Sequence, residues 1–326
     1  MSNILPATSE DIKRAADIIR EGGLVAFPTE TVYGLGADAL NPHAVARVFE
    51  VKNRPHFDPM IVHINSLACI EQLCLKVDER ARRLMERFWP GPLTLVLPKS
   101  QVVPDIVTAG LPTVAVRMPS HPVALELIKE AGTPIAAPSA NLFGHLSPTS
   151  AEHVREQVGS KVDLILDGGK CPVGVESTVI SLTEKEALLL RPGGLSLEDT
   201  ERVIGKVKIP KSNPKRPQSP GQLLRHYSPK TPLRLLTEEI VFENGKRIGF
   251  LAFTPPEETL SYEMVEVLSP RGDLREAAAN LFSCLHRLDK AGLDIIYAEP
   301  VSEGGLGRAI MDRLCRASRE YCQRGE

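Results

Sequence analysis

The sequence predicts an α/β protein with two domains. Short apolar runs, such as 24–27 and 113–118, alternate with stretches of helical periodicity, such as 78–89, which is the pattern of strands separated by helices. The 326 residues exceed the common domain size of about 100–200 residues. A proline-rich stretch also interrupts the alternation. We therefore expect a large domain over 1–205, a linker over 206–232 and a small α/β domain over 233–326.

Each element of the large domain has its own signal. Ile12, Ala15, Ala16 and Ile19 recur at helical spacing behind a cap at Thr8 or Ser9. Further helices are expected at 78–89, 121–130 and 149–158. Short apolar runs rich in β-branched residues predict strands at 24–27, 60–64, 93–97, 113–118, 134–137, 164–167 and 177–182. In the small domain we expect strands at 247–253 and 294–299, a helix at 274–288 and a final helix.

Composition limits the class of protein. Hydrophobic residues make up 42% and charged residues 25%, and the formal net charge is -2, as in an ordinary globular protein. No run approaches 18 apolar residues, so we expect no membrane segment. The six cysteines form no CxxC pair, which favours reduced thiols and a cytoplasmic location.

The linker is both proline-rich and basic. Six of the 27 prolines fall within 205–232, and this stretch holds no acidic residue. Proline lacks a backbone donor and fixes φ, so the stretch is neither a helix nor a central strand. Two interpretations remain open, a solvated spacer and a basic strap that closes over an anion.

Two loops of the large domain could carry ligand contacts. In the segment 27–39, hydroxyls and two glycines follow a strand, which suits either a small-ligand site or a simple turn between a strand and a helix. It lacks the spacing of a P-loop and of a dinucleotide fingerprint. In the segment 51–64, Lys52, Arg54 and His56 could grip phosphate, or could serve solubility alone. His63 lies in an apolar strand, where a core role is the more common one.

Polar side chains at strand ends form a third group. It comprises Arg117, Ser139, Asn141, Ser147, Ser177 and Arg191. Ser147 precedes Pro148 as a helix N-cap would, and Thr149 with Glu152 offers a capping box. With no Ser-His-Asp order and no metal-ligand spacing, the group favours ligand binding over nucleophilic catalysis. In the small domain, the glycine-rich turn at 304–314 could bind an anion at a helix start.

Several motifs together resemble, in order and spacing, the YrdC-like family of threonylcarbamoyl-AMP synthases. They are FPTETVYGLGADA, KNRPHFDPMIVHI, FWPGPLTLVL, VAVRMPSHP, APSANLFGHLSPTSAEHV, GVESTVISL and LRPGG. The phrases SPGQLLRHYSPKTP and GLGRAIMDRLCRAS are similar to the two-domain form. The resemblance implies a twisted mixed sheet with surrounding helices and a large, concave, positively charged cavity, followed by a small Rossmann-like domain.

The implied activity is the condensation of L-threonine, bicarbonate and ATP to threonylcarbamoyl-AMP and pyrophosphate. The product would pass to a machinery that modifies tRNA beside the anticodon, and a weak contact with tRNA is also expected. Mg²⁺ would arrive with ATP, without a metal cage made by the protein.

The resemblance also assigns residues. Lys52 and Arg54 match catalytic positions. Thr31, His63, Arg117 and Ser177 match positions that hold threonine. The positions around ATP correspond to Arg54, Asp58, Thr113, Ser139, Ser147, Arg191 and Tyr227. Asp58 stands where the family commonly has asparagine, and Ala137 where it often has serine or threonine. The match implies that Tyr227 closes over the site, which makes the linker a lid rather than a spacer.

Two other functions are compatible with parts of the sequence. The basic linker and the loop at 52–56 would also suit an RNA-binding module without chemistry, although nucleic-acid binders usually carry a strong basic excess. A related carbamoyl-adenylate enzyme with another acceptor is the third candidate.

Overall fold

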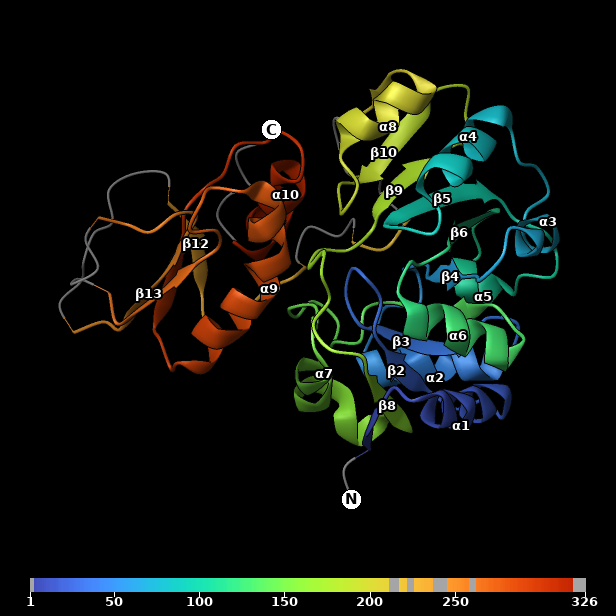
Figure 1. The fold of residues 1–326 in the computed structure, drawn as a ribbon, viewed down its shortest axis with the longest axis horizontal. Coiled ribbons are helices and arrows are strands. Elements are labelled where there is room, and N and C mark those ends of the chain that lie inside the picture. Colours follow the sequence, from blue (N-terminus) through green and yellow to red (C-terminus); the bar gives the residue numbers. More distant parts are fainter. Residues whose placement is uncertain (1–2, 211–216, 222–225, 237–244, 258–261, 319–326) are drawn as a thin grey trace.

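A computed structural model describes residues 3–210, 217–221, 226–236, 245–257 and 262–318. Within these residues the chain forms two separate β-sheets, one of 11 strands and one of four strands. The two sheets and their helices lie side by side along the longest axis of the molecule (Figure 1). In the described part of the chain, no helix is long and apolar enough to span a membrane.

The large sheet is mixed and has the strand order β1-β8-β2-β3-β7-β4-β6-β5-β9-β10-β11. Its strands are β1 (Ile4–Pro6), β2 (Val25–Phe27), β3 (Gly34–Asp38), β4 (Ile61–His63), β5 (Leu93–Pro98), β6 (Thr113–Arg117), β7 (Ile135–Ala136), β8 (Leu164–Asp167), β9 (Thr178–Ser181), β10 (Ala187–Arg191) and β11 (Val207–Lys208). The helices around it are α1 (Ser9–Arg20), α2 (Pro42–Lys52), α3 (Ala68–Leu73), α4 (Glu79–Phe88), α5 (Asp105–Thr108), α6 (Pro122–Ala131), α7 (Ala151–Val158) and α8 (Leu197–Ile204). A short 3-10 turn, Gly159–Lys161, follows α7.

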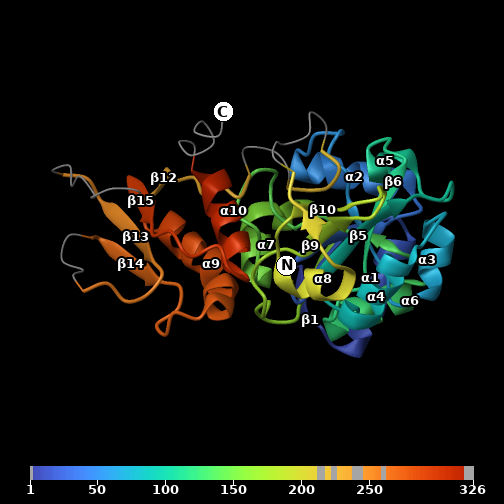
Figure 2. The same cartoon turned by 90° about the horizontal axis from the view of Figure 1, so that it is seen from above.

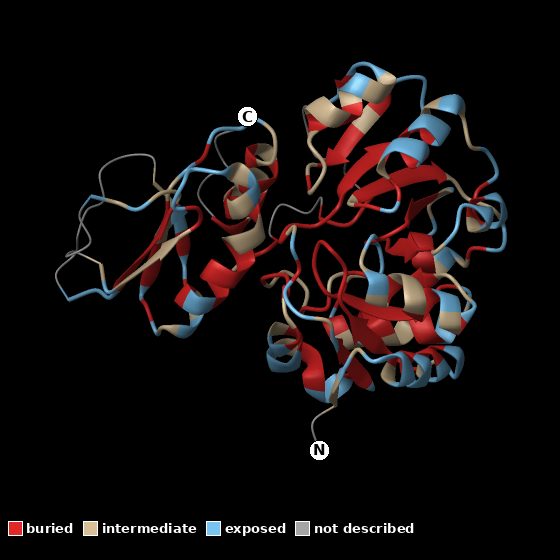
Figure 3. Cartoon of the chain, in the orientation of Figure 1, coloured by how far each residue is buried: buried red, intermediate tan, exposed pale blue. Residues whose placement is uncertain are grey.

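Both faces of this sheet are buried. Because successive side chains of a strand point to opposite faces, Val25 and Phe27 pack with α1 and α6 in one core, while Leu24 and Ala26 belong to the core on the other face. Figure 3 shows the strands as the most continuously buried part of the chain. The apolar runs in the sequence are therefore core strands, as predicted.

Two local predictions were wrong. The segment Gly34–Asp38 is not a loop but a strand, β3, in the middle of the sheet. A Cβ at Gly36 would stand 2.7 Å from the Phe27 ring and 2.8 Å from Ile135, so glycine is what allows the neighbouring aromatic ring to lie across the strand. The glycines serve packing here rather than a turn.

The start of α7 also differs from the prediction. The helix begins at Ala151, and its cap is Ser150, whose side chain accepts from the backbone N–H of His153. Ser147 is thus not an N-cap, and Thr149 with Glu152 does not form the capping box. At α1, by contrast, the cap was predicted to be Thr8 or Ser9. It is Thr8, whose side chain accepts from the backbone N–H of Asp11.

The second sheet is entirely parallel, with the order β12-β15-β13-β14. Its elements are β12 (Leu233–Leu235), β13 (Ile248–Ala252), β14 (Met264–Val267), α9 (Leu274–Lys290), β15 (Ile295–Ala298) and α10 (Gly307–Ala317). Both helices lie between this sheet and the large domain, as Figures 1 and 2 show. The alternation of strands and helices in this domain is the one expected of a small Rossmann-like unit.

The stretch predicted as a linker is only partly described. Its first residues form β11, which pairs in parallel with β10, so the large sheet extends beyond the expected boundary at residue 205. Residues 211–216 and 222–225 lie outside the described residues. In the described part, Pro220 accepts a hydrogen bond from Arg191 of the large domain, and Tyr227 lines the pocket described below.

One buried hydrophobic cluster contains residues of both domains. Val32, Leu146 and Val175 of the large domain belong to the same buried cluster as the inner faces of α9 and α10. The backbones approach closely at Gly174, where a Cβ would stand 2.5 Å from the carbonyl oxygen of Ala278 and from the Cα of Ala279 in α9. The domains are therefore packed against each other rather than tethered loosely.

Replacing Gly174 by alanine should destabilise the protein through this close approach. Gly174 and Gly169 both have positive φ, at 74° and 84°, but a Cβ at Gly169 meets nothing within 4 Å. Gly169→Ala therefore reports backbone strain alone. We expect Gly174→Ala to lower the free energy of unfolding by about 1–3 kcal/mol more than Gly169→Ala, measured by urea denaturation. Equal losses would contradict the tight packing of α9.

A pair of histidines stacks across the same interface. The rings of His153 in α7 and His286 in α9 lie 3.9 Å apart at 21°, and His286 Nε2 is 3.2 Å from the carbonyl oxygen of Ser147. Burial, followed by the charge of His286, lowers the pKa of His153 to about 3, and burial also lowers the pKa of His286. The charged groups around the pair are Lys170, Arg287, Lys290, Glu156 and Asp289.

This stack predicts that the interface weakens in acid. The unfolded chain takes up a proton on His153 near its ordinary pKa of 6.5, whereas the folded chain does so only near 3. The free energy of unfolding should therefore fall as the pH drops from about 6.5 towards 3, by at most about 1.4 kcal/mol per pH unit for this group. His153→Asn should flatten that slope in denaturation curves at pH 7 and pH 5, and an unchanged slope would contradict the prediction.

Candidate active site

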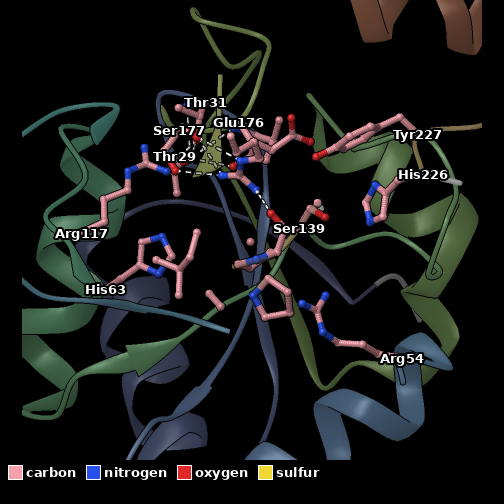
Figure 4. Close-up of a pocket in the computed structure, with 18 residues that line it drawn as sticks. Thr29, Thr31, Arg54, His63, Arg117, Ser139, Glu176, Ser177, His226 and Tyr227 are labelled. Carbon is pink, nitrogen blue, oxygen red and sulfur yellow. Dashed lines mark hydrogen bonds between the residues drawn. The ribbon is translucent and has the colours of Figure 1, made fainter. Parts of the chain in front are cut away.

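A polar pocket lies on the large domain where the second domain and the linker meet it. Its cavity measures about 40 Å³. The polar and charged residues that line it are Thr29, Thr31, Arg54, His63, Arg117, Ser139, Glu176, Ser177, Arg191, His226 and Tyr227. Figure 4 shows Arg117 and His63 on one side of the pocket and Arg54, His226 and Tyr227 on the other.

Strand ends bring most of these side chains together. Residues His63 and Arg117 end the parallel strands β4 and β6 and stand opposite each other in register. Strand β10 ends at Arg191 and runs antiparallel to β9, which begins just after Ser177. A side chain at the end of a short buried strand is held by the sheet on one side and is free on the other. The structure thus brings Arg117, Ser177 and Arg191 of the predicted strand-end group to one pocket, and His63 lies in the same wall.

Arg117 is buried and held on three sides. Its Nη1 donates to Thr31 Oγ1 at 2.9 Å, its Nε donates to the carbonyl oxygen of Gly91 at 3.2 Å, and its Nη2 lies 2.6 Å from Glu30 Oε1. Glu30 is fixed in turn by the backbone N–H of Ser120 at 3.1 Å. The guanidinium is thus oriented before any ligand arrives, and its planar fork suits a carboxylate.

His63 is neutral in this setting. Burial, and then the charge of Arg117, lower the pKa of His63 to about 3. Its ring meets Phe27 edge-on, with centroids 6.2 Å apart, and its Nδ1 has no hydrogen-bond partner among the described residues. A buried ring nitrogen without a partner is available to a ligand in the pocket.

Arg54 lines the opposite side of the pocket. Its Nε and Nη2 donate to the carbonyl oxygens of Asp58 and Pro59 at 3.1 and 2.8 Å, and its Nη2 lies 2.9 Å from Asp58 Oδ2. Burial raises the pKa of Asp58, and the cations Arg54, Lys52 and Arg191 oppose that rise. Asp58 therefore supports Arg54 from behind rather than lining the pocket.

Arg191 ties the pocket to the linker. Its Nη2 donates to both the carbonyl oxygen and Oγ of Ser177, at 2.8 and 3.0 Å, and its Nη1 donates to the carbonyl oxygen of Pro220 at 3.2 Å. Ser177 Oγ also contacts Thr94 Oγ1 at 2.7 Å. Tyr227 is 1% exposed, and its Oη lacks a hydrogen-bond partner among the described residues.

The other predicted site residues do not line the pocket. The buried ammonium of Lys52 donates to the carbonyl oxygens of Ser139 and Asn141, and so fixes the loop that carries Ser139. Thr113 pairs with Pro98 at the other end of β6 from Arg117. Ser147 is fully buried and its hydroxyl donates to Glu176. Lys52 and Ser147 therefore support residues of the pocket wall from behind, and Thr113 lies away from it.

Three polar lining residues were not predicted. Thr29 contacts Thr31 Oγ1 at 2.8 Å, and His226 precedes Tyr227. Glu176 precedes Ser177 and is buried, which would raise its pKa, yet the guanidinium groups of Arg313 and Arg191 and the Ser147 hydroxyl lower it. Each is adjacent, or next but one, to a predicted residue. The acidic Glu176 was missed because an anion-binding pocket is not expected to contain a carboxylate.

Comparisons with known proteins identify the family of this chain. The family model Sua5_yciO_yrdC, described as Telomere recombination, matches residues 17–193. The model Sua5_C, described as the C-terminal domain of threonylcarbamoyl-AMP synthase, matches residues 195–319. The chain is 49% identical over 324 residues to the threonylcarbamoyl-AMP synthase of Pyrococcus abyssi, which covers 94% of both proteins. It belongs to the Sua5 family of threonylcarbamoyl-AMP synthases.

Other Sua5 relatives support the same assignment along the whole chain. The threonylcarbamoyl-AMP synthase of Bacillus subtilis is 44% identical over 327 residues, which cover 96% of this chain and 94% of that protein. The crystal structure of P. abyssi Sua5 complexed with L-threonine has a TM-score of 0.91 and 46% identity, and covers 98% of this chain and 97% of that one. The two-domain architecture is therefore that of Sua5.

The pair of Glu30 and Arg117 predicts a specific stability pattern. The two side chains are 7% and 4% exposed, so removing one partner leaves a buried charge uncompensated. We expect Glu30→Ala to cost about 3–5 kcal/mol of unfolding free energy, and Glu30→Ala with Arg117→Met to cost less than the sum of the single changes. Asp17→Ala breaks an exposed pair with Arg20 and should cost no more than about 1 kcal/mol. Additive losses in urea denaturation would refute the coupling.

Proposed function

We propose that this chain catalyses the synthesis of L-threonylcarbamoyl-AMP and pyrophosphate from L-threonine, bicarbonate and ATP. The observation that carries the proposal is a pocket with two cationic sides, Arg117 with His63 on one and Arg54 on the other, in a chain that belongs to the Sua5 family. One side suits an amino-acid carboxylate, and the other suits phosphate oxygens.

The threonine would bind at the side of Arg117. The guanidinium, fixed by Thr31 and Glu30, pairs with the carboxylate of the amino acid. His63 stays neutral and therefore adds no positive charge next to the amine, and its free Nδ1 can make a hydrogen bond to the amine or hydroxyl. Ser177, fixed by Thr94 and Arg191, offers a hydroxyl between the two sides.

The nucleotide would bind at the side of Arg54 and Tyr227. Arg54 and Arg191 would neutralise phosphate charge, and Ser139, on the loop fixed by Lys52, would contact the nucleotide. We propose that Mg²⁺ enters with ATP, since magnesium is usually bound through substrate phosphates. This role of Lys52 differs from direct catalysis, because its ammonium already binds two backbone carbonyls.

The reaction itself requires alignment more than a protein nucleophile. The neutral amine of threonine adds to CO2 and loses a proton to solvent, or condenses with bicarbonate and releases water, and either route gives the carbamate. A carbamate oxygen then forms a bond to the α-phosphorus while the bond to the β-phosphate oxygen breaks, and pyrophosphate leaves with its electron pair. Fixed arginines on both sides of the pocket position the two anions and offset the charge that develops on the leaving group.

The direct test is pyrophosphate release by the purified protein. Release should require ATP, Mg²⁺, bicarbonate and threonine together. Release without threonine would contradict the proposal, and a preference for another amino acid would favour a related carbamoyl-adenylate enzyme. We further propose that the product passes to a tRNA threonylcarbamoyl-transfer machinery, with weak contact to tRNA. Binding of tRNA without any ATP binding would instead support an RNA-binding module.

The two sides of the pocket predict separable kinetic defects. Arg54→Ala should raise the KM for ATP, and Arg117→Ala should raise the KM for threonine, each with a loss of about 100-fold or more in kcat/KM. Arg20→Ala, in an exposed pair with Asp17 and absent from the pocket wall, serves as the control and should keep wild-type kinetics. The assignment of the two sides fails if both variants change the same KM, or if both retain wild-type kcat/KM.

A further inference from the structure

A buried arginine of the second domain reaches the pocket of the first. Arg313 lies on α10, within the glycine-led segment that the sequence marked only as a weak anion site. It is 1% exposed. Its Nε donates to Glu176 Oε2 at 2.8 Å, and its Nη1 donates to the carbonyl oxygen of Pro192 at 2.8 Å and to Asp312 Oδ2 at 2.7 Å. The side chain therefore joins α10 to two segments of the large domain.

The partner of Arg313 is the only carboxylate among the residues described as lining the pocket. Glu176 accepts from Ser147 through one oxygen and from Arg313 through the other. A buried carboxylate beside a triphosphate would repel it strongly in a low dielectric. These two hydrogen bonds fix the position of the Glu176 carboxylate, and the positive charge of Arg313 compensates its negative charge.

The same guanidinium supports Tyr227. Its central carbon lies 4.8 Å from the centroid of the Tyr227 ring, a cation–π arrangement. Phe282 of α9 packs on the same ring at 5.8 Å. Tyr227 has φ of 60°, a left-handed conformation that costs energy in a residue other than glycine and persists where packing enforces it. Phe282 and Arg313, which both pack on this ring, come from the second domain.

We infer that Arg313 is a positioning residue for nucleotide binding, supplied to the pocket by the second domain. It holds Glu176 and Tyr227 on the side of the pocket opposite Arg117, and it neutralises the one carboxylate that would repel ATP. The inference rests on the proposed function, and it gives the second domain a part in forming the site. It predicts that loss of Arg313 weakens ATP binding more than threonine binding, because Thr31, Glu30 and Gly91 hold Arg117 without it.

A neighbouring arginine on the same helix provides the matched control. Arg308 also crosses to the large domain, where its Nη2 lies 3.5 Å from Glu198 Oε1 in α8. It does not contact Glu176 or Tyr227 in any interaction described here, and it is absent from the pocket wall. Arg308→Met therefore removes an inter-domain ion pair of the same helix without touching the proposed nucleotide side.

The experiment compares Arg313→Met, Arg313→Lys and Arg308→Met with the wild type in direct binding of ATP and threonine. Arg313→Met should raise the Kd for ATP about tenfold or more and the Kd for threonine by less than about threefold. Arg313→Lys keeps a charge beside Glu176 but loses the planar group against Tyr227, so an intermediate Kd for ATP is expected. Arg308→Met should leave both constants unchanged.

A double variant keeps the test decisive if Arg313→Met does not fold. Glu176→Gln combined with Arg313→Met removes both buried charges, which is often tolerated. It should fold and bind ATP more weakly than the wild type, because Tyr227 has lost its cation. The inference is overturned if the folded Arg313 variants bind ATP within twofold of the wild type, if both ligands weaken equally, or if Arg308→Met weakens ATP binding as much.

These outcomes are distinct from a failure of the proposed function. If the wild type binds ATP but releases no pyrophosphate in the presence of threonine, the proposed synthase activity is refuted while the binding series still decides the role of Arg313. If the wild type is active and Arg313→Met binds ATP normally, only the role of Arg313 is refuted.

Discussion

Burying positive charge is the constraint on which this site depends. Arg54, Arg117, Arg191 and Arg313 are each no more than 6% exposed, and a buried guanidinium is tolerated only when the protein satisfies it. Here each of the four side chains donates to at least one backbone carbonyl group, and carboxylates partner three of the four. The arginines are consequently rigid before any ligand binds. Rigid charges lose little conformational entropy on binding and need little reorganisation during reaction.

The same constraint explains why a chain with a formal net charge of -2 can present a cationic pocket. Its positive charge is local and is partly balanced by Glu30, Asp58 and Glu176, which stand beside or behind the arginines. Such balance lowers the attraction for polyanions in general while leaving N–H donors for a ligand of the right shape. The arrangement thus favours recognition of small anions by geometry over long-range attraction of a nucleic acid.

The sequence predicted the order and type of the main strands and helices because core strands buried on both faces are continuous apolar runs. It also predicted that Arg117 and Arg191 meet at one place, since both end such runs. It did not predict the partner of Glu176, because Arg313 is 137 residues away and no local pattern encodes that distance. The contacts of Lys52 were not predicted for a related reason. A lysine in a basic loop suggests a contact with phosphate. In the structure, however, the ammonium of Lys52 donates to the carbonyl oxygens of Ser139 and Asn141, which are distant in sequence.

The position of the second domain is linked to the negative charge of Glu176. Glu176 is needed to orient the Ser147 hydroxyl, yet a free carboxylate would oppose an anionic ligand. The charge of Arg191 also acts on Glu176, but the N–H groups of Arg191 donate to Ser177 and Pro220 rather than to this carboxylate. A cation delivered by a docked helix resolves the conflict without disturbing the sheet. Since the close contact at Gly174 fixes α9 against the large domain, the packing that joins the two domains also keeps the guanidinium of Arg313 beside Glu176.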